Sequence, residues 1–271
     1  MGFTSGGFCA RANFSSLLAV LLGCGLLTTN AWGQSDNFNS GTDSAWTHYD
    51  PMAAFGSPAN FSFPNGGYRI HANVSPSPST LGPGRVASYR STPSYTDFYE
   101  TIDIVTFDTT LNQAFGLLGH LSSIGLGTTN GYALTYTVND HDLNLSLINS
   151  ENPTNLVSAT LTSPLQLGHS YQLVFTSVGS LLSGHIYDYS NPTVSLADLS
   201  AIDSTHPSGV SGLLVYDNSG SSGNVGADAT FDNYFAAVTS PEPATLALIA
   251  PFGAMLLLKR RQKSATHSRN S

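Results

Sequence analysis

Short segments of alternating apolar and polar residues recur through the middle of this 271-residue chain. A period of two is typical of half-buried β-strands, whose successive side chains point to opposite faces of a sheet. The segments expected as strands are 61–63, 68–72, 85–89, 98–107, 114–120, 132–138, 143–148, 156–161, 171–178, 181–187, 209–216 and 229–238. So many short strands with almost no helix predict an all-β fold, a sandwich of two antiparallel sheets.

Turn residues divide these segments. Asn65-Gly66 and Gly179-Ser180 each stand between two alternating segments, and both predict β-hairpins. Residues 35–58 are expected to form one edge strand and a loop, and residues 74–83, rich in Ser and Pro, a loop. Residues 195–202 are expected to form one or two helical turns, with Ser195 as the N-cap.

The first 33 residues have the pattern of a secretory signal peptide. Arg11 precedes an apolar stretch at 17–27, and Ala31-Trp32-Gly33 has the small residues of a cleavage site. Cleavage there leaves Gln34 as the first residue of the exported chain. In the alternative interpretation, Leu21-Leu22-Gly23-Cys24 is a lipobox and Cys24 is lipidated.

The other end of the chain has three parts in a fixed order. Pro241, Glu242 and Pro243 form a stiff extended segment, because each proline fixes φ and removes a backbone donor. Residues 244–258 are apolar and predict a short hydrophobic helix of about 22 Å, less than the roughly 30 Å of a hydrocarbon core. A basic stop that keeps the end cytoplasmic then follows, formed by Lys259, Arg260 and Arg261.

This order of Pro-Glu-Pro, hydrophobic segment and basic end resembles the PEP-CTERM sorting signal of Gram-negative bacteria. The resemblance implies export, transient anchoring in the inner membrane through residues 244–258, cleavage near Pro-Glu-Pro by an exosortase-type membrane protease, and delivery to the outer surface or the exopolysaccharide matrix. It divides the chain into a signal peptide (1–33), a β-sandwich domain (34–239) and a sorting signal (240–271). An ordinary C-terminal membrane anchor is the alternative.

A second resemblance covers most of the sandwich domain. Gly131-Tyr132-Ala133-Leu134, residues 167–173, residues 212–215 and residues 229–234 are similar to the late strands of concanavalin A-like and laminin G-like jelly rolls. The resemblance implies a jelly-roll sandwich, and this fold serves glycan binding, glycan hydrolysis and adhesion. Fold alone does not choose among these functions.

Charge and cysteine content exclude several classes of function. Between residues 34 and 239 the only cations among Lys and Arg are Arg69, Arg85 and Arg90, against nearly all of the acidic residues. Such an acidic domain gains nothing from counterion release on a phosphate backbone, so nucleic acid is not an expected partner. Cys9 and Cys24 both lie in the leader, which leaves the domain without a disulfide, a thiolate metal site or a cysteine nucleophile.

Glycan hydrolysis would require two carboxyl groups about 5–9.5 Å apart, and the sequence offers few. Its three glutamates are Glu100, Glu151 and Glu242; Glu151 is placed in a loop and Glu242 in the sorting signal. Asp103 follows Glu100 by three positions, an odd separation that places the two side chains on opposite faces of a strand. Glu100 is expected to be a solvated strand residue, and the domain is expected not to be an enzyme.

Calcium is the one ion with suitable ligands, because it prefers the hard oxygens that this acidic domain provides. Jelly rolls often hold a structural calcium where the first and last strands meet, which here implies Asp36 with Asp228 or Asp232. Asp140 and Asp142 are a second candidate pair, and ordinary turn-capping aspartates are the alternative for all five. The histidines are dispersed, which disfavours a zinc centre.

Tyrosines supply the other candidate chemistry, because an aromatic ring exposed on a sheet can stack on a sugar. The candidates are Tyr95, Tyr99, Tyr132, Tyr136, Tyr187 and Tyr189. The leading hypothesis is an exported, non-enzymatic surface or matrix protein whose jelly roll binds glycan or mediates adhesion. The alternatives are a glycan-active hydrolase of the concanavalin A-like class with an atypical site, and a membrane-anchored structural protein.

Overall fold

A computed structural model describes residues 33–220 and 224–238 of the chain. The described residues form fifteen strands, one short α-helix and two 3₁₀ turns. The elements are β1 (Gly33–Asp36), β2 (Thr47–Tyr49), η2 (Ala53–Phe55), β3 (Asn60–Ser62), η3 (Pro64–Gly66), β4 (Tyr68–Ala72), α1 (Pro78–Leu81), β5 (Arg85–Tyr89), β6 (Phe98–Phe107), β7 (Gln113–Ser122), β8 (Asn130–Thr137), β9 (Asp142–Asn149), β10 (Asn152–Thr160), β11 (Tyr171–Val178), β12 (Leu181–Asp188), β13 (Ser195–Ile202), β14 (Val210–Asp217) and β15 (Ala227–Ala237).

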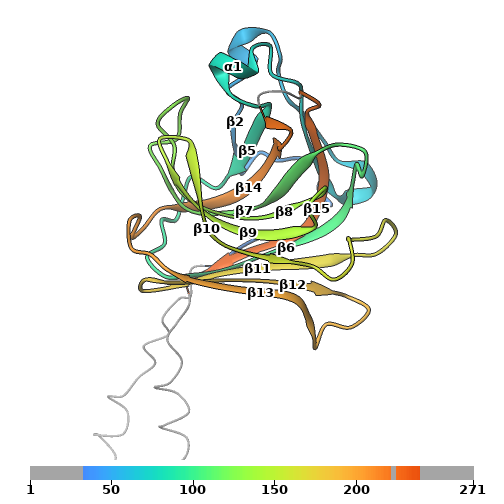
Figure 1. Ribbon diagram of the computed structural model, residues 1–271, viewed down its shortest axis with the longest axis vertical. Helices are drawn as coiled ribbons and strands as arrows, with labels where there is room; N and C mark the ends of the chain where they lie inside the picture. Colours follow the sequence, from blue (N-terminus) through green and yellow to red (C-terminus); the bar gives the residue numbers. More distant parts are fainter. Residues whose placement is uncertain (1–32, 221–223, 239–271) are drawn as a thin grey trace, which may run out of the picture. The chain divides into compact units, whose positions relative to one another are not determined.

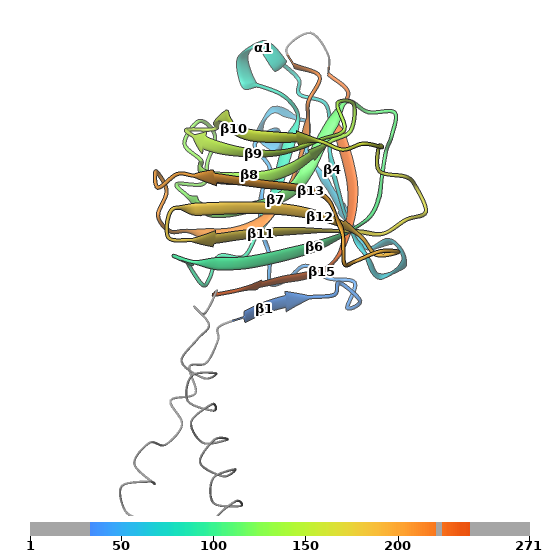
Figure 2. The ribbon, with the colours of Figure 1, turned by 60° about the horizontal axis from the view of Figure 1, so that its bottom comes forward.

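The strands form two antiparallel sheets that face each other (Figure 1). The eight-stranded sheet has the order β13-β12-β11-β6-β15-β4-β3, and β1 also pairs with β15. The seven-stranded sheet has the order β10-β9-β8-β7-β14-β5-β2. Strands distant in sequence are neighbours, as β6 lies between β11 and β15, and Figure 2 shows β1 beside β15. The described domain is therefore the two-sheet jelly-roll sandwich that the sequence predicts.

Each strand gives alternate side chains to one apolar layer between the sheets. In β6, Phe98, Ile102 and Ile104 face this layer and are almost completely buried. Aromatic rings join the two sheets, because Phe107 of β6 lies with its ring centroid 5.1 Å from that of Phe115 of β7. Burial of this apolar surface is the main stabilising term of the fold.

The structure corrects the expectation for residues 195–202, which form strand β13 and not helical turns. Ala197 and Leu199 are buried, while the residues between and beside them are more exposed. This alternation lets β13 pair with β12 over Leu181–Tyr187. Pairing at the edge of a sheet therefore determines the structure here, and the helix-capping tendency of Ser195 does not.

Two loop expectations also change. Residues 35–58 contain two strands and not one: β1 pairs with β15 in one sheet, and β2 pairs with β5 in the other. Within residues 74–83 the chain forms the single turn α1, which Pro78 begins and Gly82 ends. Pro at the first position of a helix and Gly just beyond its end is the usual arrangement.

Both predicted hairpins are confirmed. β3 pairs with β4 around the η3 turn, where Asn65 has a left-handed backbone with φ of 53°. β11 pairs with β12 from Val178 and Leu181 onward, and Gly179 in the turn has φ of 58°. Glycine and asparagine tolerate this region better than other residues, which explains why the sequence signal was reliable.

A search of the described residues finds no helix with the length and apolar character needed to cross a bilayer. The signal peptide up to residue 32, the lipobox alternative, the apolar segment 244–258 and the sorting residues lie outside the described residues.

Glu100 is the most unexpected residue of the core. The sequence predicts a solvated strand residue, but the side chain faces the layer between the sheets and is completely buried. The Tyr234 hydroxyl donates to its Oε1 at 2.9 Å. Burial raises the pKa of Glu100 well above its usual value, although the Tyr234 hydroxyl and the Gly212 backbone amide act in the opposite direction.

We expect Glu100 to make stability depend on pH. A carboxyl group whose pKa is raised in the folded state contributes its full stability below its unfolded pKa, and that contribution decreases as pH rises toward the folded pKa. Urea denaturation of Glu100→Gln at several pH values from 4.5 to 8 should show a smaller loss of stability with pH than the unsubstituted chain. Parallel pH profiles for the two proteins would contradict this account.

Candidate functional site

A hollow of about 560 Å³ lies on the outer face of the seven-stranded sheet. Its floor consists of side chains that point away from the other sheet, and most are aliphatic. Leu118 and Leu121 are only 3% exposed and Ala87 and Ala133 only 4%, although they lie on an outer face. The floor is completed by Ser146 and Ile148 of β9, Thr135 of β8, and Leu214 and Tyr216 of β14.

Loops from both ends of the sheet cover these outer-face residues. One wall comes from α1 and the residues after it, Gly82 and Pro83. The opposite wall contains Ile124, Leu126 and Gly127 of the β7–β8 connection. Figure 1 shows α1 above β5, and Thr80 and Leu81 of α1 line the hollow. Small side chains in the floor and loops around it together leave a hollow where a sheet would otherwise be flat.

An ion pair links the two sides of the hollow. Arg85 at the start of β5 makes two parallel hydrogen bonds to Glu151, from Nε to Oε1 at 3.1 Å and from Nη2 to Oε2 at 2.9 Å. The Tyr49 hydroxyl donates to Glu151 Oε1, and the Gly127 backbone N–H donates to Oε2 at 2.5 Å. The Arg85 and Glu151 side chains are only 15% and 11% exposed. Two parallel bonds between arginine and carboxylate are a strong and directional arrangement.

This contact depends on the curvature of the sheet. Glu151 follows β9, four strands from β5, and the strand register places Arg85 in the row of Asp142, at the other end of β9. On a flat sheet these positions would be roughly 35 Å apart, from a strand spacing of about 4.8 Å and a rise of about 3.3 Å per residue. Strand twist curls opposite corners of a sheet toward the same face, which allows the contact.

The hairpin turn that presents Glu151 has an unusual backbone. Ser150 and Glu151 both have left-handed conformations, with φ of 50° and 63°. Non-glycine residues seldom adopt this region, and each instance costs about 1 kcal/mol or more. The surrounding contacts must offset this cost, and the ion pair with Arg85 is the strongest of them.

Glu151 is ionised at neutral pH. Burial by itself raises the pKa of this carboxyl, but the bonds from Arg85, the Gly127 amide and Tyr49 outweigh it and lower the pKa below its usual value. Burial and the adjacent carboxylate raise the pKa of the Tyr49 hydroxyl, which therefore stays protonated. The hollow thus offers an aliphatic floor and a group of fixed donors and acceptors. Glu151 is the one acidic residue that lines it.

The carboxylates considered for hydrolysis lie apart, as predicted for Glu100 and Asp103. Glu100 faces the core, whereas Asp103 lies on the outer side of the eight-stranded sheet, where Gln172 Nε2 donates to it at 3.2 Å. Neither residue lines the hollow that contains Glu151. Within the described residues, the glutamates and Asp103 therefore provide no pair of carboxylates on one face of a cleft.

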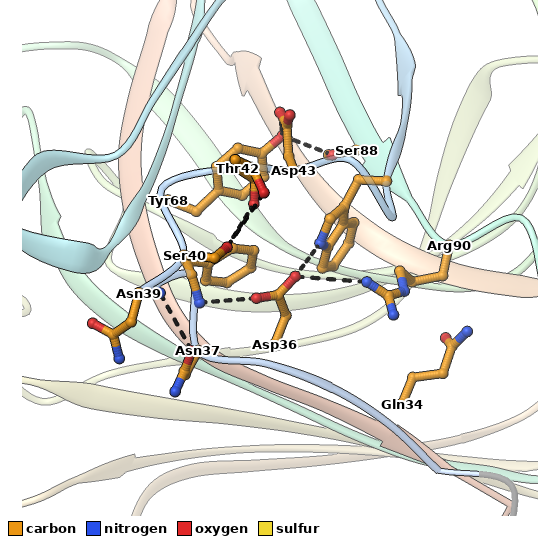
Figure 3. Close-up of polar contacts among 12 residues, drawn as sticks. Gln34, Asp36, Asn37, Asn39, Ser40, Thr42, Asp43, Tyr68, Ser88 and Arg90 are labelled. Carbon is orange, nitrogen blue, oxygen red and sulfur yellow. Dashed lines mark hydrogen bonds and ion pairs between the residues drawn. The ribbon is translucent and has the colours of Figure 1, made fainter.

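Asp36, the first residue considered for calcium, is engaged by donors of the chain itself (Figure 3). Its Oδ1 accepts the Phe38 backbone N–H at 2.9 Å, and its Oδ2 accepts Trp46 Nε1 at 2.9 Å. Arg90 Nη1 lies 3.6 Å from the same Oδ2 and also stacks over the Trp46 ring at 5.2 Å. Asp36 thus anchors Trp46 at the edge of the core.

The other two aspartates considered for calcium lie on β15. Asp228 pairs with Arg69, whose Nε donates to Oδ1 at 2.8 Å. Along β15, Asp228 is six residues from Tyr234, and Tyr234 lies opposite Asp36 of β1. Six residues span roughly 20 Å of strand, so Asp228 and Asp36 are not neighbours. Asp232 lies opposite Asp103 of β6 and two residues from Tyr234. Burial raises the pKa of Asp232, as do the carboxylates of Asp103 and Asp36, although the Asn233 backbone amide acts in the opposite direction.

No group of three or more His, Cys, Asp or Glu that could hold a metal ion is found among the residues that the structure describes. Asp140 lies exposed in the turn before β9, which Asp142 begins. Calcium binding by any of these aspartates stays a prediction. Pro241, Glu242, Pro243, Lys259, Arg260 and Arg261 lie outside the described residues.

The six candidate tyrosines divide into two groups. Tyr95, Tyr132 and Tyr136 are buried in the core and are not available to a ligand. The others line a depression on the outer face of the eight-stranded sheet: Tyr99, Tyr187 and Tyr189. The alternation of side chains in β6 is the sequence signal that could have shown Tyr99 facing outward, because the buried residues Phe98 and Glu100 flank it. The pairing of Glu151 with Arg85, 66 positions away, has no signal in the sequence.

The fold belongs to the class of lectin-like jelly rolls, in which two antiparallel sheets form a sandwich. Among solved structures, the chain is similar to the carbohydrate-binding module CBM66 from Bacillus subtilis, with a TM-score of 0.50, 16% identity, and coverage of 70% of this chain and 93% of the module.

It is also similar to the exoplasmic/lumenal domain of VIP36. The Ca2+-bound form gives a TM-score of 0.53 at 9% identity, with coverage of 78% of this chain and 92% of that domain. The Ca2+/Man3GlcNAc-bound form gives a TM-score of 0.51 at 9% identity, with coverage of 74% of this chain and 86% of that domain. No family model and no curated protein matches the sequence. At such low identities the similarities show the fold.

We expect Glu151→Gln to reduce stability by about 1–3 kcal/mol at pH 7, because the substitution removes a charge that three donors share. A carboxyl group whose pKa is lowered in the folded state contributes stability above its unfolded pKa, and this contribution is lost as pH falls through the folded pKa. The difference between the two proteins in urea denaturation should therefore close below about pH 4.

Asp140→Asn is a suitable control, because Asp140 is exposed in a turn, and its effect should stay within about 0.5 kcal/mol at both pH values. A Glu151→Gln difference that persists unchanged at pH 3 would show that the ion pair is not its source.

Proposed function

We propose that the chain is an exported, non-enzymatic surface or matrix protein whose jelly-roll domain binds a neutral glycan in the hollow of the seven-stranded sheet. The observation on which this proposal rests is the mainly aliphatic floor beside the fixed cluster of Arg85, Glu151 and Tyr49. A largely apolar cavity with a few convergent polar groups is the usual form of a small-ligand site. The lectin-like fold supports the same class of ligand.

The two parts of the hollow suit the two kinds of surface on a sugar. A pyranose ring has C–H faces that pack on aliphatic side chains such as Leu118 and Leu214. Its hydroxyls can accept from the second Nη2 hydrogen of Arg85 and donate to the Tyr49 hydroxyl oxygen. Glu151 already accepts four bonds, so it acts by holding these two groups in place. Because these groups are already held in place by each other, binding requires little further ordering of side chains.

Charge favours a neutral glycan over an acidic one. All three arginines of the domain lie beside carboxylates: Arg69 beside Asp228, Arg85 beside Glu151, and Arg90 beside Asp36. No further Lys or Arg occurs between residues 34 and 239, so an anionic polysaccharide would find no cation free of a carboxylate there. The remaining acidic residues would repel it.

The carboxylates of the site support a non-enzymatic role. Glu151 has no second acid beside it in the lining of the hollow, and its bonds to Arg85 lower its pKa, which is unfavourable for a general acid. The chain would then act by holding a glycan. The hydrolase alternative receives no support from this arrangement.

The sorting part of the proposal rests on the sequence. Pro241, Glu242 and Pro243, the apolar residues 244–258 and the basic stop of Lys259, Arg260 and Arg261 resemble the PEP-CTERM signal. We infer that the chain passes through the inner membrane of a Gram-negative bacterium, is cleaved by an exosortase-type protease, and reaches the outer surface or the exopolysaccharide matrix.

We expect Ala133→Phe to weaken glycan binding at least 10-fold, because the added ring would occupy the floor of the hollow. The full chain and the variant would be compared on an array of neutral and acidic polysaccharides, followed by titration calorimetry with the best ligand. Ile202→Ser is the control, since Ile202 is 80% exposed at the end of β13 and lies outside the hollow. Unchanged binding by Ala133→Phe, with a retained thermal transition, would place the site elsewhere. No binding to any polysaccharide would leave only a structural role.

We expect the mature protein to end near Pro241–Pro243 when it is isolated from cells that contain an exosortase. Mass spectrometry of its C-terminal peptide checks this directly. An intact tail from Lys259 to Ser271 would instead support the plain membrane-anchor alternative.

A further inference from the structure

A second depression, of about 400 Å³, lies on the outer face of the eight-stranded sheet. Tyr99, Tyr187 and Tyr189 line it, together with Gln172 and His185. Tyr99 is 39% exposed and Tyr189 is 47% exposed, so their rings are available to solvent. A large aromatic side chain that stays exposed on a sheet face has no role in the core of this domain.

Strand register explains why these residues share one surface. Tyr99 of β6 lies opposite Thr176 of β11. Two residues further along β6, Thr101 lies opposite Val174, which in turn lies opposite His185 of β12. The next outward row contains Asp103 of β6, Gln172 of β11 and Tyr187 of β12. Tyrosines thus stand at the two ends of a patch that is three strands wide.

Hydrogen bonds hold the lining in a fixed arrangement. The Tyr189 hydroxyl donates to Asp103 Oδ1 at 2.6 Å, and Gln172 Nε2 donates to the Tyr189 hydroxyl at 3.0 Å. His185 Nδ1 lies 2.5 Å from Asp198 Oδ1, which orients its imidazole. The Tyr99 ring contacts Phe235 of β15 edge to face, with centroids 6.3 Å apart. A surface with orientated rings and amides loses little side-chain freedom when a ligand binds.

We propose that this depression is a second glycan-binding surface, specific for neutral chains whose sugars present flat C–H faces. The exposed tyrosine rings would stack on C–H faces of successive sugars, while Gln172 and His185 would bond to hydroxyls. Asp103 and Asp198 border the patch and no Lys or Arg lines it, which disfavours uronic acids and sulfated sugars.

The consequence is a bivalent domain. The hollow and the depression lie on the outer faces of the two sheets, with the core between them, so one chain could hold two separate glycan strands. Bivalence rests on the proposed function of the hollow, whereas the depression can be tested independently of it. A matrix protein with two such faces would cross-link polysaccharide without forming an oligomer.

The test is titration calorimetry of the full chain with hexasaccharides of β-1,4-linked glucose, mannose or N-acetylglucosamine. Two sites per chain are expected. Tyr99→Ala and Tyr189→Ala should each weaken one site by about 5–10-fold, the loss expected for one aromatic contact. Tyr99→Phe keeps the ring and should retain binding, which separates stacking from a general loss of structure. Ile202→Ser, on the same sheet but outside the depression, should change nothing.

The outcomes distinguish the two proposals. A single site that Ala133→Phe removes and the tyrosine variants do not would overturn the second surface and leave the hollow. A single site that only the tyrosine variants weaken would support the depression and reject the hollow. Binding that none of these variants alters, or no binding to any of the three hexasaccharides, would reject the depression as a glycan surface.

Discussion

The apolar layer between the two sheets determines the rest of this structure. Each strand can give only every second side chain to that layer, and the others must face outward. In β6 this rule sends Phe98, Ile102 and Ile104 inward, and Tyr99 and Asp103 outward. It also forces Glu100 into the core, where Tyr234 provides its hydrogen bond. The side chains that the core does not use form the two outer faces, and these differ in their residues. The hollow has a mainly aliphatic floor bordered by loops, and the depression is lined by tyrosines.

The hollow exists because a twisted sheet brings its corners together. Arg85 begins β5 and Glu151 lies in the turn after β9, four strands away, yet they make two parallel hydrogen bonds. The left-handed backbone of Ser150 and Glu151 costs free energy that a hairpin with Asn-Gly in its turn would avoid. A turn that keeps this unfavourable backbone is consistent with a role for the Glu151 side chain beyond closing the hairpin. The contacts indicate that this role is to hold the carboxylate beside the aliphatic floor.

The sequence predicted the features that depend on local pattern. Alternation and turn residues were sufficient for the two-sheet sandwich, for both hairpins, and for the opposite faces of Glu100 and Asp103. The helix expected at residues 195–202 is wrong, because it depends on the tendency of Ser195 to cap a helix. The alternation of Ala197 and Leu199 is a strand pattern, and it is this pattern that lets β13 pair with β12. Burial of Glu100 and the joining of Arg85 to Glu151 depend on contacts distant in sequence. No local pattern indicates which outward residues the sheet's twist will bring together.

The two proposed ligand sites lie on opposite outer faces, and this has a mechanical consequence. Paired sheets lie about 10 Å apart, and a close-packed core transmits force with little deformation. A load applied to a glycan on one face would reach the other through hydrogen-bonded strands and not through a flexible linker. Arg90 stacked on Trp46, with Asp36 bonded to the same indole, ties β1 and the segment after it to this rigid body. β1 and β15 pair at Gly33 and Ala237, so the start of the first described strand lies beside the end of the last one. A tether at the C-terminal end would then pull on β15, a central strand of its sheet, and not on a strand at the edge.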